Sequence, residues 1–305
     1  MIFGMLRCVG AFLLPGVCAF GADAELMNLL PASTKVVAGV NAGQAKTTPF
    51  GQFLLSRMAA ENHWTAKAGF DPRTDLQEIL METPGQPAQR GLVLAKGTFN
   101  VKLILGAAEA SGHKIEAYHG IPVLTGKEST TAHAVAFLGD TIAIAGDADS
   151  VRAAIDRRGA TSVAIDAGLA AQVAQLSESL DAWSISTVPL AALAQEKIQD
   201  EQLNALLNSD LLRSIQQSSG GVKFGQTVQF SGQAVADSSQ NATALAQMVR
   251  FLGDMARSSA PAPAATAIAS LLQTLRIGTE GNALHLAAAL PEAQLESLVR
   301  SAHGN

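Results

Sequence analysis

The sequence predicts an α+β fold made of two structurally related halves, each a largely antiparallel sheet with packed helices and a closing hairpin–helix module. The main observation is that two stretches, Ala132–Arg158 and Leu275–Ala302, share one pattern of strand, tight turn, strand and helix. A second observation is that strands and helices elsewhere do not alternate strictly enough for a doubly wound parallel sheet. We therefore treat the two stretches as an internal repeat.

In the first stretch, apolar residues alternate with a period of two on both sides of Gly139-Asp140, at Val135, Phe137, Ile142 and Ile144. This alternation is typical of two half-buried strands, and the glycine supplies the positive φ that a hairpin turn needs. The segment from Gly146 to Asp149 then ends the strand, and an aspartate there can cap the next helix. That helix has an apolar face at Val151, Ala154 and Ile155.

The second stretch repeats the pattern around Glu280-Gly281-Asn282, with alternating apolar residues at Leu275, Ile277, Leu284 and Leu286. Pro291 suits the first turn of a helix. The apolar face of that helix is Leu295, Leu298 and Val299. If the repeat is structural, the two modules should superpose, and the apolar faces of their helices should cover equivalent cores.

Capping and propensity signals predict the other elements of the first half. Thr48 followed by Pro49 begins a helix that runs to His63-Trp64, with a buried stripe at Phe50, Phe53, Leu54 and Met58. Thr74–Leu80 is predicted as a short helix whose capping box would be Thr74 and Gln77. The remaining elements are a helix at 25–30, strands at 35–40 and 91–95, a helix at 100–111, and a hairpin of 115–118 with 121–125.

The second half is predicted to start with a strand at Ala182–Val188, after an Ala- and Gln-rich, weakly helical junction. Its other elements are helical spacing over 190–212, strands at 222–225 and 227–236, a helix at 241–257, a Pro-rich loop at 258–263 and a helix at 264–273. The predicted domain organisation is a signal peptide at 1–22, a first half at 23–159, a junction at 160–181 and a second half at 182–305.

The first residues predict a secretory signal that is removed. A weakly positive start precedes Cys8–Phe20, an apolar core too short to span a bilayer. Small residues precede two cleavage positions, after Gly21 and after Ala24. A lipoprotein signal is the rival interpretation because Cys18 lies in the apolar stretch, although Pro15-Gly16-Val17 departs from the usual Leu-Ala-Gly context. We therefore expect an exported protein, either periplasmic or secreted.

Composition and charge limit the kinds of partner and ligand that the protein can have. The chain is 48% hydrophobic and 15% charged, which is typical of a globular protein with a sizeable core. A formal charge of −5 argues against nucleic acid as a general partner. Cys8 and Cys18 both lie in the predicted signal, so the mature chain would have no thiol, disulfide or cysteine ligand. No segment after the signal is apolar for long enough to cross a membrane.

Two segments rich in glycine or aspartate resemble ligand-binding motifs, but the spacing of their residues does not match either motif. A phosphate-binding loop needs four residues between its glycines and a hydroxyl after its lysine, but in Gly120–Glu128 five residues intervene and a glutamate follows the lysine. Asp147-Ala148-Asp149 resembles the start of a calcium loop, but Val151 and Arg152 stand where an oxygen ligand and a glycine are required. A hairpin and a helix cap explain these segments better.

Other chemical groups are scattered along the chain. Histidines occur singly, and three of them could converge across neighbouring strands as a metal site: His113, His119 and His133. The densest acidic cluster, which suits helix capping better than an acid–base pair, is Asp71, Asp75 and Glu78. No GxSxG elbow is present, but a Ser-His-Asp triad of distant residues stays open. The sequence therefore nominates no catalytic, cofactor-binding or metal-binding residue, and no cofactor.

The chain resembles a group of uncharacterised exported bacterial proteins, whose domain has no known function. The residues that carry the resemblance are Thr48–Leu55, Gly69–Leu80, Phe137–Ile155 and, more weakly, Leu284–Leu298. They span most of the mature chain but consist of packing and turn residues. The resemblance implies an envelope or secreted location and a duplicated α+β architecture, and it brings no catalytic residue with it.

These observations favour a non-enzymatic exported module that binds or supports a partner protein at the cell envelope. The hypothesis depends on the export signal and on the lack of a recognisable chemical constellation. One alternative is a hydrolase with a dispersed Ser/His/Asp or carboxylate site. Another is a carrier that captures an apolar small molecule between the two halves.

Overall fold

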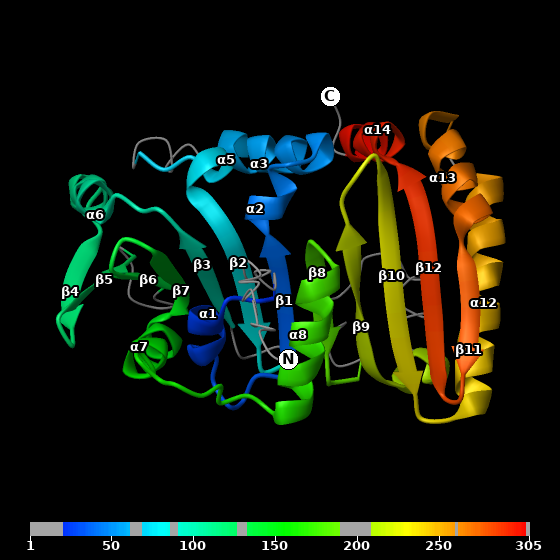
Figure 1. Cartoon of the computed structure of the whole chain (residues 1–305), viewed down its shortest axis with the longest axis horizontal. Coiled ribbons are helices and arrows are strands. Elements are labelled where there is room, and N and C mark those ends of the chain that lie inside the picture. The colour runs from blue at the N-terminus through cyan, green and yellow to red at the C-terminus, as the bar shows by residue number, and fades with distance from the viewer. Residues whose placement is uncertain are drawn as a thin grey trace, which may run out of the picture.

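A computed structural model of the chain describes residues 21–61, 69–85, 91–126, 133–189, 209–259 and 262–302. In these ranges the protein is α+β, with helices packed on a single sheet of 12 strands (Figure 1). Every pair of neighbouring strands is antiparallel. The predicted fold class, α+β with a largely antiparallel sheet, is therefore confirmed.

The strands have the following bounds: β1 Val36–Asn41, β2 Leu76–Thr83, β3 Leu92–Gly97, β4 Lys114–Tyr118, β5 Ile121–Thr125, β6 His133–Leu138, β7 Ile142–Asp147, β8 Ala182–Ser186, β9 Ile215–Lys223, β10 Thr227–Ala236, β11 Arg276–Glu280 and β12 Ala283–Pro291. The described helices have the following bounds: α1 Ala24–Asn28, α2 Ala42–Ala45, α3 Pro49–Glu61, α5 Pro72–Asp75, α6 Val101–Ala110, α7 Ala148–Asp156, α8 Ala167–Ser179, α11 Asp210–Arg213, α12 Ser239–Ser259, α13 Ala262–Thr274 and α14 Glu292–Ala302.

The order of the strands is the same in the two parts of the sheet. β1 and β8 pair at the centre, and from there the strands run outward as β1-β2-β3-β7-β6 on one side and β8-β9-β10-β12-β11 on the other. The first side adds the β5–β4 hairpin at its end. The two parts thus share one sheet, and their common strand order fits the predicted duplication, which stays a prediction.

A large hydrophobic core joins the two parts at the centre of the sheet. Val37 of β1 lies opposite Ile185 of β8, and both belong to this core. Trp183, which is 5% exposed, lies opposite Gly39 on β1. A Cβ atom on Gly39 would come within 2.4 Å of the Trp183 ring, so the ring occupies the space that the glycine leaves. The absence of a side chain at Gly39 is therefore a packing requirement.

Helices cover different faces of the sheet in its two parts. Helices α1, α7 and α8 lie in front of the sheet in Figure 1 and bury Leu26, Val151 and Val173 in the central core. Helix α12 packs on the opposite face of the second part, where Leu245 meets Ala236 and Leu284. α8, which lies inside the predicted junction, packs against β1, β8 and β9.

The helix predicted over Thr74–Leu80 is wrong. Helix α5 ends at Asp75, and residues 76–83 form β2 between β1 and β3. Asp71 caps α5 by accepting from the Arg73 amide at 2.9 Å, so the predicted capping box does not form. Leu80 is fully buried on β2, but Glu78 and Glu82 take neighbouring positions on the same face. These glutamates interrupt the apolar alternation that would have indicated a strand.

Other boundaries differ from the sequence prediction where side chains are small or polar. Strand β9 begins at Ile215 instead of Val222, because the Gln-Gln-Ser-Ser-Gly-Gly segment has little strand propensity but pairs with β8 and β10. Helices α12 and α13 extend into the predicted 258–263 loop. On α3, Leu55 is buried and Met58 is 37% exposed, contrary to the predicted stripe. The end of that helix at 63–64 and the predicted helical segment over 190–208 lie outside the described residues.

The remaining predicted strands and helices are found close to their expected positions, and the two hairpin–helix modules form as predicted. Their helices do not cover equivalent cores. In α7, Val151 and Ile155 are buried against the sheet, whereas Leu295 of α14 is half-buried. α14 lies at the end of the sheet against α3 and α13, and Glu292 accepts a hydrogen bond from the Phe50 amide. An acidic residue is favourable there because it meets the amide end of α3.

Candidate functional site

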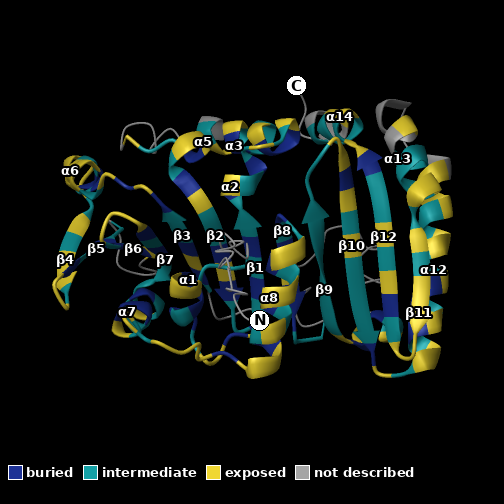
Figure 2. Cartoon of the chain, in the orientation of Figure 1, coloured by how far each residue is buried: buried dark blue, intermediate teal, exposed yellow. Residues whose placement is uncertain are grey.

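The second part of the sheet has an open polar face. Residues that are directly opposite on neighbouring strands share a face, and one such row continues from the buried Trp183 across Gly221, Ser231, Ala287 and Arg276. In Figure 1, α7, α1 and α8 lie over the corresponding face of the first part, whereas no described helix lies over β10 and β12. Figure 2 shows the change from buried residues at the centre to half-buried and exposed residues here.

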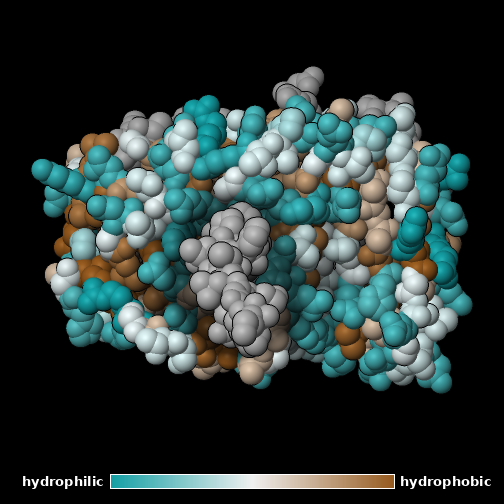
Figure 3. All heavy atoms as spheres, in the orientation of Figure 1, coloured by the Kyte–Doolittle hydropathy of each residue, from teal (hydrophilic) through white to brown (hydrophobic). Residues whose placement is uncertain are grey.

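Alternation along β10 and β12 separates the two faces. Even-numbered residues such as Val228 and Leu284 are buried, and those at 236 and 284 contact α12. Odd-numbered residues such as Gln229 and Ser231 are exposed on the other side. The part of the surface over β10 and β12, on the right in the space-filling view, is mostly hydrophilic and neutral (Figure 3).

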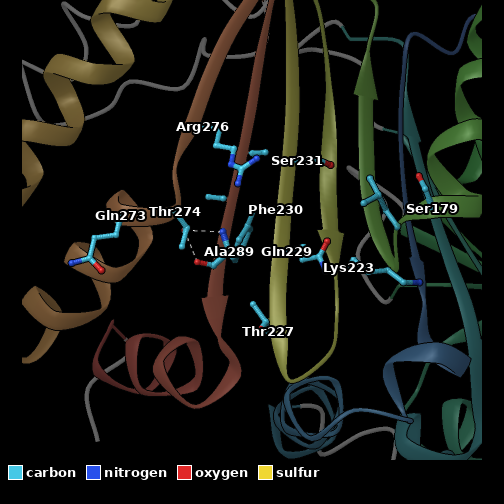
Figure 4. Close-up of a pocket in the computed structure, with 13 residues that line it drawn as sticks. Ser179, Lys223, Thr227, Gln229, Phe230, Ser231, Gln273, Thr274, Arg276 and Ala289 are labelled. Carbon is cyan, nitrogen blue, oxygen red and sulfur yellow. Dashed lines mark hydrogen bonds between the residues drawn. The ribbon is translucent and has the colours of Figure 1, made fainter.

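A groove of about 690 Å³ runs over this open face, which we call the sheet groove (Figure 4). Its floor is formed by β10 and β12, and the C-terminal ends of α8 and α13 flank it. The residues that give it its chemistry are Ser179, Lys223, Thr227, Gln229, Ser231, Gln273, Thr274 and Arg276. Small side chains at Ala287 and Ala289 leave the floor low, so that the backbone of a ligand could approach the strands.

One cation of the sheet groove is held by a buried acid. Lys223 Nζ lies 2.7 Å from Asp181 Oδ1, and the Asp181 side chain is 3% exposed. The other Asp181 oxygen accepts from the Phe224 amide at 2.7 Å. The backbone of Asp181 also bonds to Val222 and Asn41, which fixes it between β9 and β1. The charge of Lys223 is thus largely satisfied within the protein.

The second cation is Arg276, at the other side of the groove. Within the described part of the chain, no acidic side chain forms an ion pair with it. The nearby Thr274 hydroxyl, in contrast, has partners within the protein. It donates to the Ala289 carbonyl at 2.6 Å and accepts from the Ala289 amide at 3.0 Å. Those bonds tie the end of α13 to β12 and fix the wall from which Arg276 extends.

The sheet groove suits binding better than catalysis. Its lining contains hydroxyl groups, amides and two cations, and the described lining includes no histidine or carboxylate that could act as a base for a hydroxyl nucleophile. Arginine binds carboxylates through paired hydrogen bonds. The groove can therefore hold a polar ligand with an anionic group placed near Arg276.

A second hollow, of about 550 Å³, lies beside Glu82 near the start of α7. Glu82 is buried on β2, where its two oxygens accept from the Thr34 hydroxyl at 2.9 Å and the Leu92 amide at 3.0 Å. Burial raises the pKa of Glu82, and these hydrogen bonds and the nearby Arg157 offset part of the increase. Arg157 Nε donates to the Leu29 carbonyl at 2.8 Å, and its buried Nη2 has no hydrogen-bond partner among the described residues.

This second hollow also lacks the parts of a hydrolase. Ser150 lines it, but the Ser150 hydroxyl donates to Asp147 Oδ2 at 2.7 Å. No histidine is among the described residues that line this hollow. A serine paired directly with an aspartate has no general base of suitable pKa near neutral pH. The open possibility of a distant Ser-His-Asp triad therefore gains no support at either hollow.

The residues of the rejected calcium loop form a helix cap, as the sequence analysis favoured. Asp147 Oδ1 accepts from the Ser150 amide at 2.9 Å at the start of α7. Desolvation raises the pKa of Asp147, but the hydrogen bonds from Ser150 outweigh it and the pKa is lowered. Within the described ranges, no three His, Cys, Asp or Glu residues are grouped so that they could hold a metal ion.

We expect Asp147→Ala to lower the free energy of unfolding by about 1–2 kcal/mol, because the first amides of α7 lose their acceptor. Asp147→Asn should cost less, since its carbonyl oxygen can still accept from the Ser150 amide. Urea unfolding followed by circular dichroism measures both values. If Asp147 were instead part of a calcium site, added calcium would raise the free energy of unfolding of the unmodified protein. A helix cap predicts no such effect of calcium.

The three histidines and the acidic cluster are not brought together. His119 sits at the β4–β5 turn with φ 48° and contacts Asp156 at 3.4 Å. His133 lies opposite Asp147 on β7, and His113 bonds to the Ala108 carbonyl. In the acidic cluster, Asp71 and Asp75 serve α5, where Asp75 Oδ2 accepts from the Asp71 amide at 2.8 Å.

Glu78 and Glu82 are the residues of chemical interest that the sequence did not single out as a pair. Both are on β2, and burial raises the pKa of each, to about 7 for Glu78. The available signal was the pair of glutamates at 78 and 82, two residues before and after Leu80 in a segment that otherwise alternates. The residues of the sheet groove gave no signal, because isolated Gln, Ser and Arg residues occur on any exposed strand.

Among the described residues, none of the helices is both long and apolar enough to span a bilayer. No protein-family model matches the chain, and no curated protein matches it. Among solved structures, crystal form IV of TP0453 is similar, with 9% sequence identity and a TM-score of 0.49. The similarity covers 90% of this chain and 95% of that one.

Proposed function

We propose that this protein is an exported, non-enzymatic module that binds a partner protein of the cell envelope through the sheet groove. The observation that carries the proposal is the open face of β10 and β12, where the first part of the sheet has helices over it. Export is supported by the apolar segment and small residues at the start of the chain. The resemblance to exported bacterial proteins supports the same location.

The chemistry of the sheet groove indicates the kind of segment it would bind. A low floor of alanine and serine suits an extended backbone, and the glutamine side chains at 229 and 273 can bond to peptide groups. Arg276 favours an acidic side chain on the partner. We therefore propose an extended, polar segment with at least one carboxylate.

The carrier alternative has less support from the geometry. β1 and β8 form a continuous ladder of hydrogen bonds, and Trp183 and Ile185 fill the core where the two parts meet. An apolar ligand between the halves would have to displace this core. The hydrolase alternative has less support because neither hollow combines a nucleophile with a base.

Substitutions in the sheet groove should reduce partner capture without unfolding the protein. Ala287 is exposed on the floor between Ser231 and Arg276, so Ala287→Trp would fill the groove. Arg276→Glu would reverse the charge beside it. We expect each to lower the amount of partner captured from envelope extract by roughly tenfold, through steric blocking in Ala287→Trp and through charge reversal in Arg276→Glu. Quantitative mass spectrometry of the captured proteins measures this.

The matched control is Ala117→Trp, which places the same large side chain on an exposed position of β4, at the far edge of the sheet. It should capture as much partner as the unmodified protein. Equal capture by all variants would show that the sheet groove is not the binding site. Size-exclusion chromatography of each variant establishes that the fold is intact.

A further inference from the structure

The first described residues are part of the folded structure. Ala22 packs against the central hydrophobic core. Its amide donates to the Ser177 hydroxyl at 2.8 Å, and this hydroxyl in turn donates to the Val173 carbonyl at 2.7 Å. Ser177 is buried on α8, so the hydrogen bond from Ala22 satisfies a group that water does not reach.

Asp23 makes three further connections. Its carboxylate caps α1 by accepting from the Glu25 amide at 2.9 Å, and it forms an ion pair with Lys96 of β3. Its backbone amide donates to both oxygens of Glu78 at 3.2 Å. α1 places Leu26 in the central core, where it is fully buried. The cap therefore supports an element on which the core depends.

These contacts discriminate between the two cleavage positions that the sequence leaves open. Cleavage after Ala24 would remove the cap of α1, one of the two acidic partners of Lys96 and the amide that donates to Glu78. Cleavage after Gly21 would leave them all in place. A chain that begins at Ala22, one residue before the predicted start of the first half at 23, is therefore the shortest form that keeps these contacts.

We propose that the mature protein begins at Ala22 and that its new α-ammonium group forms an ion pair with Glu78. This proposal rests on the proposed function, because it assumes export. An endopeptidase of the export pathway would hydrolyse the Gly21–Ala22 bond, with water supplying the hydroxyl of the Gly21 carboxylate and a proton of the Ala22 amine. The reaction converts a neutral amide into a cation near the half-buried carboxylate of Glu78.

The covalent geometry places the new charge close to Glu78. Consecutive backbone nitrogens are at most about 3.7 Å apart, so the Ala22 nitrogen lies within roughly 7 Å of the Glu78 oxygens that bond to the Asp23 amide. An ammonium group has three donors. One can keep the bond to Ser177, and the proposal requires the first residue to turn so that another donor reaches the Glu78 carboxylate.

The surroundings of Glu78 explain why a nearby cation would stabilise the protein. In the chain that retains its first residues, burial raises the pKa of Glu78 to about 7, and the Asp23 charge adds to this effect. Lys96 opposes it, but Lys96 is already paired with Asp23 and Glu25. A cation within a few ångströms favours the ionised carboxylate and lowers its pKa.

The first test is the N-terminal sequence and intact mass of the protein recovered from the envelope or medium. We expect the sequence to begin at Ala22. A start at Glu25, or a lipid-modified Cys18, would overturn the inference and leave export intact. Recovery of the chain only inside the cell and still beginning at Met1 would instead overturn the proposed export.

The second test isolates the ion pair. The chain that begins at Ala22 is prepared with a free amine and with an acetylated amine, which keeps the donor to Ser177 but removes the charge. At pH 7, where the α-amino group is largely charged, we expect the free amine to raise Tm by roughly 2–4 °C relative to the acetylated form. In Glu78→Gln, this difference should vanish. Equal Tm values in the unsubstituted pair, or a difference that persists in Glu78→Gln, would overturn the ion pair.

The pH dependence gives a further readout with a definite sign. A folded pKa of about 7 against an unfolded value near 4.5 means that the folded acetylated form binds more protons between these values. Its stability is therefore full below about pH 4.5 and falls as pH rises to about 7. The free-amine form should lose less stability over this window. An equal loss in both forms would contradict the proposal.

Discussion

Trp183→Ala is expected to lower the free energy of unfolding by about 3–5 kcal/mol, the range for deleting a large aromatic side chain from a core. Trp183 is 5% exposed and lies at the centre of the sheet, between Gly39 on β1 and Gly221 on β9. Its loss would open a cavity where the two parts of the sheet meet. Equilibrium unfolding in urea, followed by circular dichroism, measures the change.

The contact with Gly39 can be tested separately. In the unsubstituted protein, Gly39→Ala should cost about 1–3 kcal/mol, because the new Cβ would lie 2.4 Å from the Trp183 ring. In the Trp183→Ala background, the same substitution should cost almost nothing. Ser184→Ala, on the exposed side of the same strand, is the control and should change stability by less than about 0.5 kcal/mol. A cost of Gly39→Ala that is equal in both backgrounds would show that the ring does not depend on the glycine.

The elements that the sequence predicted well are those in which local signals and burial agree. β10 has the predicted bounds, Thr227–Ala236, and α6 is capped by Asn100 and followed by Gly112 with φ 80°. In each case a propensity or capping signal coincides with the final packing. The hairpin of β6 and β7 formed for the same reason, with Gly139 at φ 61°.

The features that the sequence did not reveal depend on partners far along the chain. No local pattern near Ile215 predicts the start of strand β9. This strand is stabilised by its pairing with β8 and β10, which come from other parts of the chain. The face at Ser231 is left uncovered by the described helices, because α14 packs against α3 and α13 at the end of the sheet and α12 packs on the opposite face. Glu78 has an unusual pKa because the fold buries part of it, and the Asp23 amide that donates to it comes from 55 residues earlier in the chain. Local patterns carry no information about such pairs.

Glu82→Ala is the second substitution with a large expected effect. It leaves the buried Leu92 amide and Thr34 hydroxyl without their acceptor and removes the carboxylate whose charge most favours the charged form of the partly buried Arg157. Loss of one side of a buried hydrogen-bonded charge network costs about 2–4 kcal/mol. Urea unfolding at pH 7 measures it. Glu116→Ala, on the exposed strand β4, should be close to neutral and serves as the control.

Glu82→Gln separates the charge of this residue from its hydrogen bonds. The amide keeps an acceptor for the Leu92 N–H, so Glu82→Gln should cost less than Glu82→Ala. Because the folded pKa of Glu82 is raised, the unsubstituted protein loses stability as pH rises from the unfolded value through the folded one. The glutamine variant lacks this loss, and Glu78 contributes equally to both proteins. Glu82→Gln should therefore gain stability relative to the unsubstituted protein between pH 5 and pH 8. A difference that does not change with pH would mean that Glu82 titrates normally and that burial does not disfavour its charge.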